Sequence, residues 1–320
     1  MTETGAKNNK ETLMDDSAAM ANDNGTEVNG LEPMRNENGN LTMDNGTMND
    51  DGQAREAAKE PAQLGEPMIQ LKNVCMSFRD RSILKDLDLA VRHGEILVVI
   101  GPSGSGKSTL LKLMIGLIKP TAGEIWVDGQ EITGMNEDEL NRIRRHMGMV
   151  FQYSALFDSM TVGENVAFGI RQHKEISEIQ INRVIRRTLR MVGLMGRENL
   201  MPSELSGGMK KRVSLARAIA VNPQIILYDE PTSGLDPVMS STINRLIMST
   251  RRILGMTAVV VTHDMDSAFL IADRIAMMSN EKIIETGTPD EFRQSANPTV
   301  QQFITGVKNS CIPVRRRKSD

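Results

Sequence analysis

The chain contains few cysteines, few aromatic residues and no long apolar run. Its only two cysteines, Cys75 and Cys311, lie far apart and lack the spacing of metal ligands. This argues against a disulfide framework or a zinc site, and it predicts a reducing, cytoplasmic setting. No segment approaches the ~20 apolar residues that a membrane-spanning helix needs. If the protein acts at a membrane, another polypeptide must therefore cross it.

The net charge of −3 conceals a strongly acidic N-terminal segment. Residues 1–66 contain 14 Asp and Glu against 5 Lys and Arg, together with ten Asn and no aromatic residue. Such a segment cannot bury enough apolar surface to offset its chain entropy, so we predict a disordered acidic tail. It has neither the apolar stretch of a secretory signal nor the arginine-rich composition of a transit peptide.

The C-terminal residues 307–320 are predicted to form a flexible basic tail. Its run Arg315–Lys318 could contact nucleic acid or anionic lipid, although four charges at a terminus are most often only solvated.

Between these tails, short apolar segments alternate with helical patterns over residues 67–306. This alternation predicts one α/β domain with a largely parallel sheet. The expected strands that bear on function are Glu95–Ile100, Met147–Phe151, Gln224–Tyr228 and Thr257–Val261. A helical stretch of about 238–254 between the last two strands makes one βαβ unit, so these strands should be parallel.

A phosphate-binding loop follows the first of these strands. Gly101–Ser108 fits the pattern G-x-x-x-x-G-K-[ST], and a helix is expected over Thr109–Leu117. In such a loop the glycines let backbone N–H groups surround the phosphates, Lys107 reaches the outer phosphates, and Ser108 can hold Mg²⁺. A short pattern of this kind can occur by chance, but its position between a predicted strand and a predicted helix favours a P-loop.

Polar residues follow the other three strands at the point where each strand ends. They are Gln152, the pair Asp229 and Glu230, and His263. Ligands of parallel sheets gather at the carboxyl ends of the strands, so all four should lie at one edge together with the loop. The acidic pair could instead form a structural salt bridge, and a lone histidine is more often structural. His93, His146 and His173 have no comparable placement and are interpreted as structural or surface residues.

A second anion-binding signature lies about a hundred residues after the loop. Leu205–Met209 reads Leu-Ser-Gly-Gly-Met, a small-residue turn opening a helix whose free N–H groups and positive dipole end suit an anion. One nucleotide does not need two such sites, so the simplest arrangement is two chains that share two nucleotides. The basic run Lys210–Arg212 on this helix is either a solvated face or an electrostatic support for the site.

These motifs, in this order, resemble the ATP-binding subunits of ABC transporters over about Pro67 to Gly306. The resemblance implies a P-loop NTPase fold of the RecA-like type, with an inserted helical subdomain at about 153–220 and an antiparallel β portion on the N-terminal side. It also implies Mg²⁺-ATP as the bound nucleotide. The implied Walker A residues are Gly101, Pro102, Ser103, Gly104, Ser105, Gly106, Lys107, Ser108 and Thr109.

The same resemblance implies roles for the remaining motif residues. Phe78 would stack on adenine, with a core phenylalanine as the alternative. Gln152 would contact Mg²⁺ and the attacking water, Asp229 would hold Mg²⁺, and Glu230 would be the general base. The implied signature motif comprises Ser206, Gly207 and Gly208, the implied D-loop ends at Asp236, and His263 would be the switch histidine.

Three further stretches are similar to the ATPases of the Mla/MCE-type phospholipid transporters, the toluene-tolerance group. They are Glu204–Val213, with Met209 where many family members carry Gln, Ala155–Phe168 and Asn297–Gly306. This implies a peripheral protein at the cytoplasmic face of the cell membrane. Its partners would be a second copy, an integral membrane permease and an MCE-domain protein.

Two other functions remain open at this point. One is an importer ATPase for amino acids, metals or another solute. The other is an ABC ATPase acting on nucleic acid, which is disfavoured because the chain lacks paired ATPase domains, long coiled coils and cysteine-based zinc sites. No nucleic-acid partner is therefore expected.

Overall fold

The computed structural model describes residues 67–79, 81–173 and 176–306. The predicted acidic tail and the predicted basic tail both lie outside the described residues.

A six-stranded sheet forms the centre of the described domain, in the order β10-β9-β3-β8-β7-β6. All neighbouring strands are parallel except β10, which runs antiparallel to β9 at one edge. The strands are β3 (Ile96–Ile100), β6 (Met147–Val150), β7 (Ile225–Asp229), β8 (Thr257–Val261), β9 (Arg274–Ser279) and β10 (Lys282–Gly287). The prediction of a largely parallel sheet is confirmed.

A second sheet of four antiparallel strands contains most of the N-terminal part of the domain, in the order β2-β1-β4-β5. Its strands are β1 (Pro67–Phe78), β2 (Arg81–Arg92), β4 (Ala122–Val127) and β5 (Gln130–Glu131). It is the antiparallel portion that the family resemblance implied.

The helices of the described domain are α1 (Lys107–Met114), α2 (Glu137–Arg144), α3 (Val162–His173), α4 (Glu178–Met191), α5 (Gly207–Ala220), α6 (Pro237–Leu254), α7 (Met265–Ile271), α8 (Pro289–Arg293) and α9 (Pro298–Gly306), with a short 3-10 turn η1 (Pro202–Glu204). Helices α3 to α7 lie between strands of the parallel sheet, α1 and α2 link the two sheets, and α8 and α9 follow the last strand. Helices α3, α4 and α5 all fall between β6 and β7, and each of the three packs against the other two.

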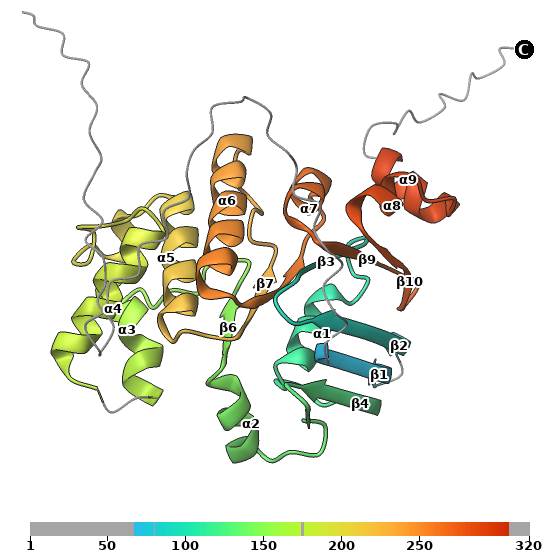
Figure 1. Ribbon diagram of the computed structural model, residues 1–320, viewed down its shortest axis with the longest axis horizontal. Coiled ribbons are helices and arrows are strands. Elements are labelled where there is room, and N and C mark those ends of the chain that lie inside the picture. The colour runs from blue at the N-terminus through green and yellow to red at the C-terminus, as the bar shows by residue number, and fades with distance from the viewer. Residues whose placement is uncertain (1–66, 80, 174–175, 307–320) are drawn as a thin grey trace, which may run out of the picture. The chain divides into compact units, whose positions relative to one another are not determined.

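Alternate residues of the parallel strands enter two separate cores. On β3, Val98 and Ile100 pack with α3 to α7, whereas Leu97 and Val99 pack with α1 and the antiparallel sheet. In Figure 1, α5 and α6 accordingly lie on the opposite side of the parallel sheet from α1, β1, β2 and β4. Both faces are covered, which explains why these strands read as continuous apolar runs rather than alternating ones.

Several boundaries differ from the sequence prediction by one to three residues, and two of these differences fall at the candidate site. Helix α1 begins at Lys107 rather than Thr109, because Gly106 adopts a left-handed conformation (φ 97°) and its carbonyl already accepts from Leu110 N at 2.9 Å. Asp229 is the last residue of β7 rather than the first residue after it. The predicted helical stretch of about 238–254 is confirmed as α6, and Gly255 ends it with φ 65°.

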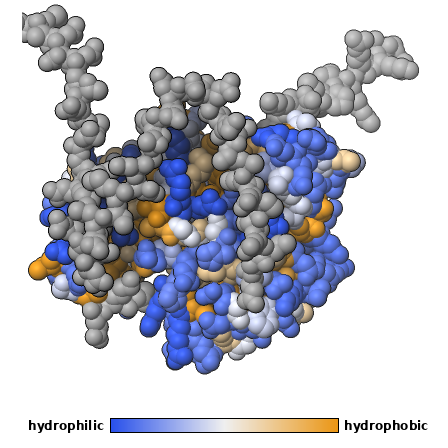
Figure 2. All heavy atoms as spheres, viewed as in Figure 1, coloured by the Kyte–Doolittle hydropathy of each residue, from blue (hydrophilic) through white to orange (hydrophobic). Residues whose placement is uncertain are grey.

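Hydrophilic residues cover most of the described surface in the view of Figure 2, and hydrophobic residues appear there in small groups. Among the residues that the structure describes, no helix is long and apolar enough to cross a membrane.

Candidate nucleotide site

The loop after β3 has a backbone that requires glycine. Gly101 has a φ of 153°, and a Cβ atom placed on it would lie 2.3 Å from the carbonyl oxygen of Met278 on β9. Gly104 and Gly106 also have positive φ values of 80° and 97°. Pro102, Ser103 and Gly104 are exposed, so the loop presents its backbone to the solvent at the edge of the sheet.

Lys107 is folded back into this loop. Its ammonium donates to the carbonyl oxygens of Gly101 at 2.8 Å and Pro102 at 3.0 Å, and only 8% of the residue is exposed. Burial lowers the pKa of Lys107, and the carboxylates of Glu230 and Asp229 oppose that shift. The loop therefore surrounds a cation within the field of both acidic residues.

Ser108 and Asp229 meet beside the loop, although they lie far apart in the chain. The Ser108 hydroxyl donates to Oδ1 of Asp229 at 3.0 Å, and burial raises the pKa of the Asp229 carboxyl. A hydroxyl and a carboxylate suit Mg²⁺, which usually takes one or two protein oxygens and completes its shell with water and phosphate oxygens. Within the described residues there is no cluster of three or more His, Cys, Asp or Glu that would suit a metal held by protein alone.

Glu230 and His263 also come together, from the ends of the neighbouring strands β7 and β8. His263 Nδ1 lies 2.8 Å from Glu230 Oε2, with 65% of the histidine side chain and 12% of the glutamate side chain exposed. The backbone of Glu230 is left-handed, with φ 49°, which is rare for a residue with a long side chain. The strand-edge prediction is thus confirmed in its geometry, whereas the chemical roles of these residues stay predictions.

Gln152 joins the group from the end of β6, the edge strand of the sheet. Its Nε2 donates to Ser233 Oγ at 3.4 Å, in the segment that follows Glu230. The pairing of Val150 with Tyr228 on the adjacent strands brings Gln152 and Glu230 to matching positions two residues further on.

Lys211 is a site residue that the sequence prediction did not resolve. Its ammonium donates to the carbonyl oxygens of both Gln152 and Glu230. The residues Gly208, Lys211, Leu215 and Ala218 follow each other at helical spacing and are all buried. That spacing was the available signal, but the three consecutive cations Lys210–Arg212 suggested a solvated face instead.

The serine–glycine turn lies at the start of α5, as predicted. Ser206 caps the helix, with its hydroxyl accepting from Met209 N at 3.3 Å. Ser206 and Gly207 are exposed, and a Cβ atom on Gly207 would meet nothing within 4 Å. The start of the helix is thus open to solvent at Ser206 and Gly207.

The structure places Phe78 and Asp236 at element ends. The expected roles, adenine stacking for Phe78 and the D-loop for Asp236, stay predictions. Phe78 ends β1 with 49% of its surface exposed, and it pairs across the hairpin turn with Arg81. Asp236 caps α6, where its carboxylate accepts from Val238 N and Met239 N at 2.9 Å.

A cavity of about 490 Å³ lies beside the loop. It is lined in part by residues that the sequence did not suggest, namely Arg81, Ser82, Ile83, Ser279, Asn280 and Glu281.

Together, the sheet and this edge define a P-loop nucleotide-binding domain. The model of the ABC transporter family matches residues 84–233. The chain is 42% identical over 252 residues to the intermembrane phospholipid transport system ATP-binding protein MlaF of Haemophilus influenzae, covering 79% of this chain and 95% of that protein. The chain belongs to the ABC transporter family and is an ATPase.

Two further similarities extend this result. The methionine import ATP-binding protein MetN of Carboxydothermus hydrogenoformans is 42% identical over 250 residues, covering 77% of this chain and 74% of that protein. The dimeric structure of a post-hydrolysis state of the ATP-binding cassette MJ0796, bound to ADP and Pi, has a TM-score of 0.65 and 35% identity. It covers 69% of this chain and 99% of that chain.

The close approach of Gly101 to Met278 predicts the effect of a single methyl group. In Gly101→Ala the new Cβ must displace either the loop or β9, so we expect the affinity for a fluorescent ATP analogue to fall by at least about tenfold, or 1.4 kcal/mol. Gly134→Ala is the control, because its Cβ meets nothing within 4 Å and its φ is not positive. Unchanged affinity in Gly101→Ala, measured by titration, would show that the loop tolerates the displacement.

Proposed function

We propose that this chain is the ATP-hydrolysing subunit of a phospholipid transporter and works as a head-to-tail dimer. In this dimer the Ser206 turn of each chain closes on the nucleotide held by the P-loop of the other. The observation that carries the proposal is the exposed turn at Ser206 and Gly207, a helix N-terminus of the kind that binds anions and one that is open to solvent within one chain. The dimeric state of the cassette relative MJ0796 supports it.

The residues gathered at the strand ends have the chemistry that phosphoryl transfer requires. Phosphoryl transfer depends mainly on positioning and on stabilising the charge that spreads over the phosphate oxygens. In this proposal Lys107 supplies a positive charge from within the loop, and Glu230 orients or deprotonates the attacking water.

Ser108, Asp229 and Gln152 would hold Mg²⁺, which supplies charge neutralisation on the phosphates when bound. Ser108 and Asp229 already share a hydrogen bond, so their oxygens can be brought to one ion with little rearrangement.

The contact between His263 and Glu230 supports a role for the histidine in the same reaction. His263 is the more exposed partner, so it can turn toward the γ-phosphate while Glu230 stays buried behind it. We assign it the role of holding the γ-phosphate in line for attack. In this assignment Glu230 acts on the attacking water and His263 acts on the γ-phosphate.

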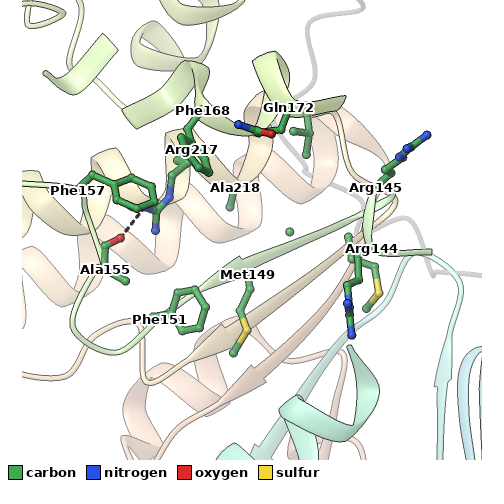
Figure 3. Close-up of a pocket in the computed structure, with 14 residues that line it drawn as sticks. Arg144, Arg145, Met149, Phe151, Ala155, Phe157, Phe168, Gln172, Arg217 and Ala218 are labelled. Carbon is green, nitrogen blue, oxygen red and sulfur yellow. Dashed lines mark hydrogen bonds between the residues drawn. The ribbon is translucent and has the colours of Figure 1, made fainter. Parts of the chain in front are cut away.

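A groove next to Gln152 supports docking to a membrane permease. It has a volume of about 550 Å³ and lies between β6, α3 and α5, as Figure 3 shows. Phe157 and Phe168 pack at 4.6 Å between ring centroids, and Arg217 fixes the adjacent loop by donating to the carbonyl oxygens of Ala155 and Ser154. Arg144 and Arg145 line the far end.

The groove includes Phe151, which directly precedes Gln152 in the chain and is 38% exposed. A permease segment with apolar side chains would fit this lining and would contact the loop that leads directly to the nucleotide site. This proposal places the chain at the cytoplasmic face of the membrane as a peripheral subunit.

Phospholipid is the favoured substrate class for two reasons. The chain matches 95% of the length of the phospholipid transport relative but only 74% of the methionine import relative, at the same identity. The stretches around Met209 and after Gln152 also resemble the phospholipid group. An MCE-domain protein is the lipid-binding partner that we expect.

The assignment of Glu230 as the general base predicts a trapped state. Glu230→Gln should retain ATP binding, lose at least about 100-fold in kcat, and accumulate as an ATP-bound dimer. The measurements are ATPase rate and sedimentation velocity with Mg²⁺-ATP. Glu131→Gln, at an exposed position of β5, is the control and should behave as the unmodified chain. Normal turnover by Glu230→Gln would rule out this base.

The groove predicts an effect on permease binding. Phe157→Ala removes one half of the aromatic pair and should reduce the amount of permease recovered with the tagged chain from detergent-solubilised membranes by about tenfold. Leu117→Ala, also an exposed hydrophobic residue but outside the groove, is the matched control. Equal recovery with both variants would place the permease elsewhere.

The substrate is tested on the purified complex with its permease. Mass spectrometry of the complex should find bound phospholipid and an MCE-domain protein, and added phospholipid should change the ATPase rate. If methionine stimulates the rate and phospholipid does not, the chain is an amino-acid importer subunit and the lipid proposal is wrong.

A further inference from the structure

Lys211 is a buried cation that none of the roles above uses. It lies on α5, five residues after the capping Ser206, and only 7% of it is exposed. A lysine is rarely buried to this extent unless its ammonium is paired. Here the ammonium donates to two backbone carbonyl oxygens, that of Gln152 and that of Glu230, the latter at 3.3 Å.

The two carbonyl oxygens belong to positions where the sheet has just ended. The paired ladder of β6 and β7 stops at Val150 and Tyr228, and Gln152 and Glu230 each lie two residues beyond that pair. A cation with several donors can hold both backbone segments at once. Lys211 therefore links the ends of two neighbouring strands to a helix.

The backbone of Glu230 needs such support because its left-handed conformation is unfavourable for glutamate. Glu230 N donates to Val261 O at 2.9 Å, and Glu230 O accepts from Ser233 N at 3.2 Å as well as from Lys211. These hydrogen bonds fix the direction in which the Glu230 side chain leaves the sheet. Removing Lys211 would leave the turn after β7 with one constraint fewer.

Charge favours the same arrangement. Burial lowers the pKa of Lys211, and the carboxylates of Glu230 and Asp229 counteract this. Lys211 and Lys107 therefore both interact electrostatically with the carboxylates of Glu230 and Asp229. Lys107 does so from the P-loop, and Lys211 does so from α5.

The start of α5 lies close to α6. A Cβ atom on Gly208 would lie 2.1 Å from Cε of Met239 on α6. The Ser206 turn and Lys211 belong to the same helix, five residues apart.

We propose that Lys211 is a positioning residue that couples the serine–glycine turn to the general base of the same chain. The turn closes on the partner's nucleotide, whereas Glu230 acts on the nucleotide of its own chain. Through Lys211, closure at one nucleotide sets the backbone of Glu230 at the other. The inference rests on the proposed function for the roles of Glu230 and the turn.

The test uses the full chain with Mg²⁺-ATP and three substitutions. Lys211→Met keeps the length of the apolar stem and removes the donors, and Lys211→Arg keeps donors and charge. Lys211→Gln removes the charge and leaves a shorter side chain that cannot reach both carbonyl oxygens at once. We expect kcat of Lys211→Met to fall about 10- to 100-fold, because small displacements of a reacting group have effects of that size, with KM for ATP changed less than about threefold. Lys211→Arg should recover most of the loss.

Lys210→Met is the matched control, since Lys210 precedes Lys211 on the same helix and is not buried. It should keep the kcat of the unmodified chain. If Lys211→Met does not fold, as judged by thermal unfolding, Lys211→Gln replaces it and should show reduced kcat at unchanged KM.

The outcomes separate this inference from the proposed function. If Glu230→Gln is inactive but Lys211→Met and Lys211→Gln both keep kcat within about twofold, the positioning role is wrong and the base assignment stands. A parallel rise of KM and fall of kcat, without recovery in Lys211→Arg, would likewise overturn it, because that pattern indicates general damage to the site. If Glu230→Gln turns over normally, the proposed function itself fails.

Discussion

The parallel pairing of β3, β8, β7 and β6 is the constraint on which the site depends. Parallel strands end at the same edge, so the residues that follow them are brought together whatever their distance in the chain. The contact of Ser108 with Asp229 and that of Glu230 with His263 both cross between such strand ends. A shift of one strand in register would separate these pairs and move apolar side chains out of both cores.

The glycines of the P-loop allow the loop to pass close to the neighbouring strand of the parallel sheet. Gly101 lies so close to the carbonyl of Met278 that no side chain fits between the loop and β9. The loop can follow its path past β9 only because Gly101 carries no side chain. Lys107 completes it by bonding to the carbonyls of the loop itself. A preformed loop of this kind reduces the reorganisation that nucleotide binding requires.

Much of this arrangement could be predicted from the sequence, because strand ends and glycine spacing leave strong local signals. The alternation of buried strands and helices placed Gln152, Glu230 and His263 at one edge, and Ser206 at the start of a helix. What the sequence did not reveal depends on three-dimensional packing. Lys211 looked like one member of a solvated run, and only the packing of α5 against both β6 and α6 turns it inward.

Arg81 is another residue that the sequence could not assign. It approaches the loop through the hairpin of β1 and β2, and a hairpin's position relative to a distant loop has no local signature. The start of α1 at Lys107 likewise depends on the left-handed Gly106, where a Cβ atom would lie 2.9 Å from Leu84 and 3.2 Å from Ile83.

The central claim is that each nucleotide is held between two chains. Mixing two inactive variants tests it most directly: Lys107→Ala, which disables the P-loop, and Ser206→Arg, which disables the turn. In a mixed dimer, the intact loop of one chain faces the intact turn of the other, so ATPase activity absent from either variant alone should appear in the mixture. If the mixture stays as inactive as its components, while both variants remain folded and form dimers, each chain completes its own site and the account is contradicted.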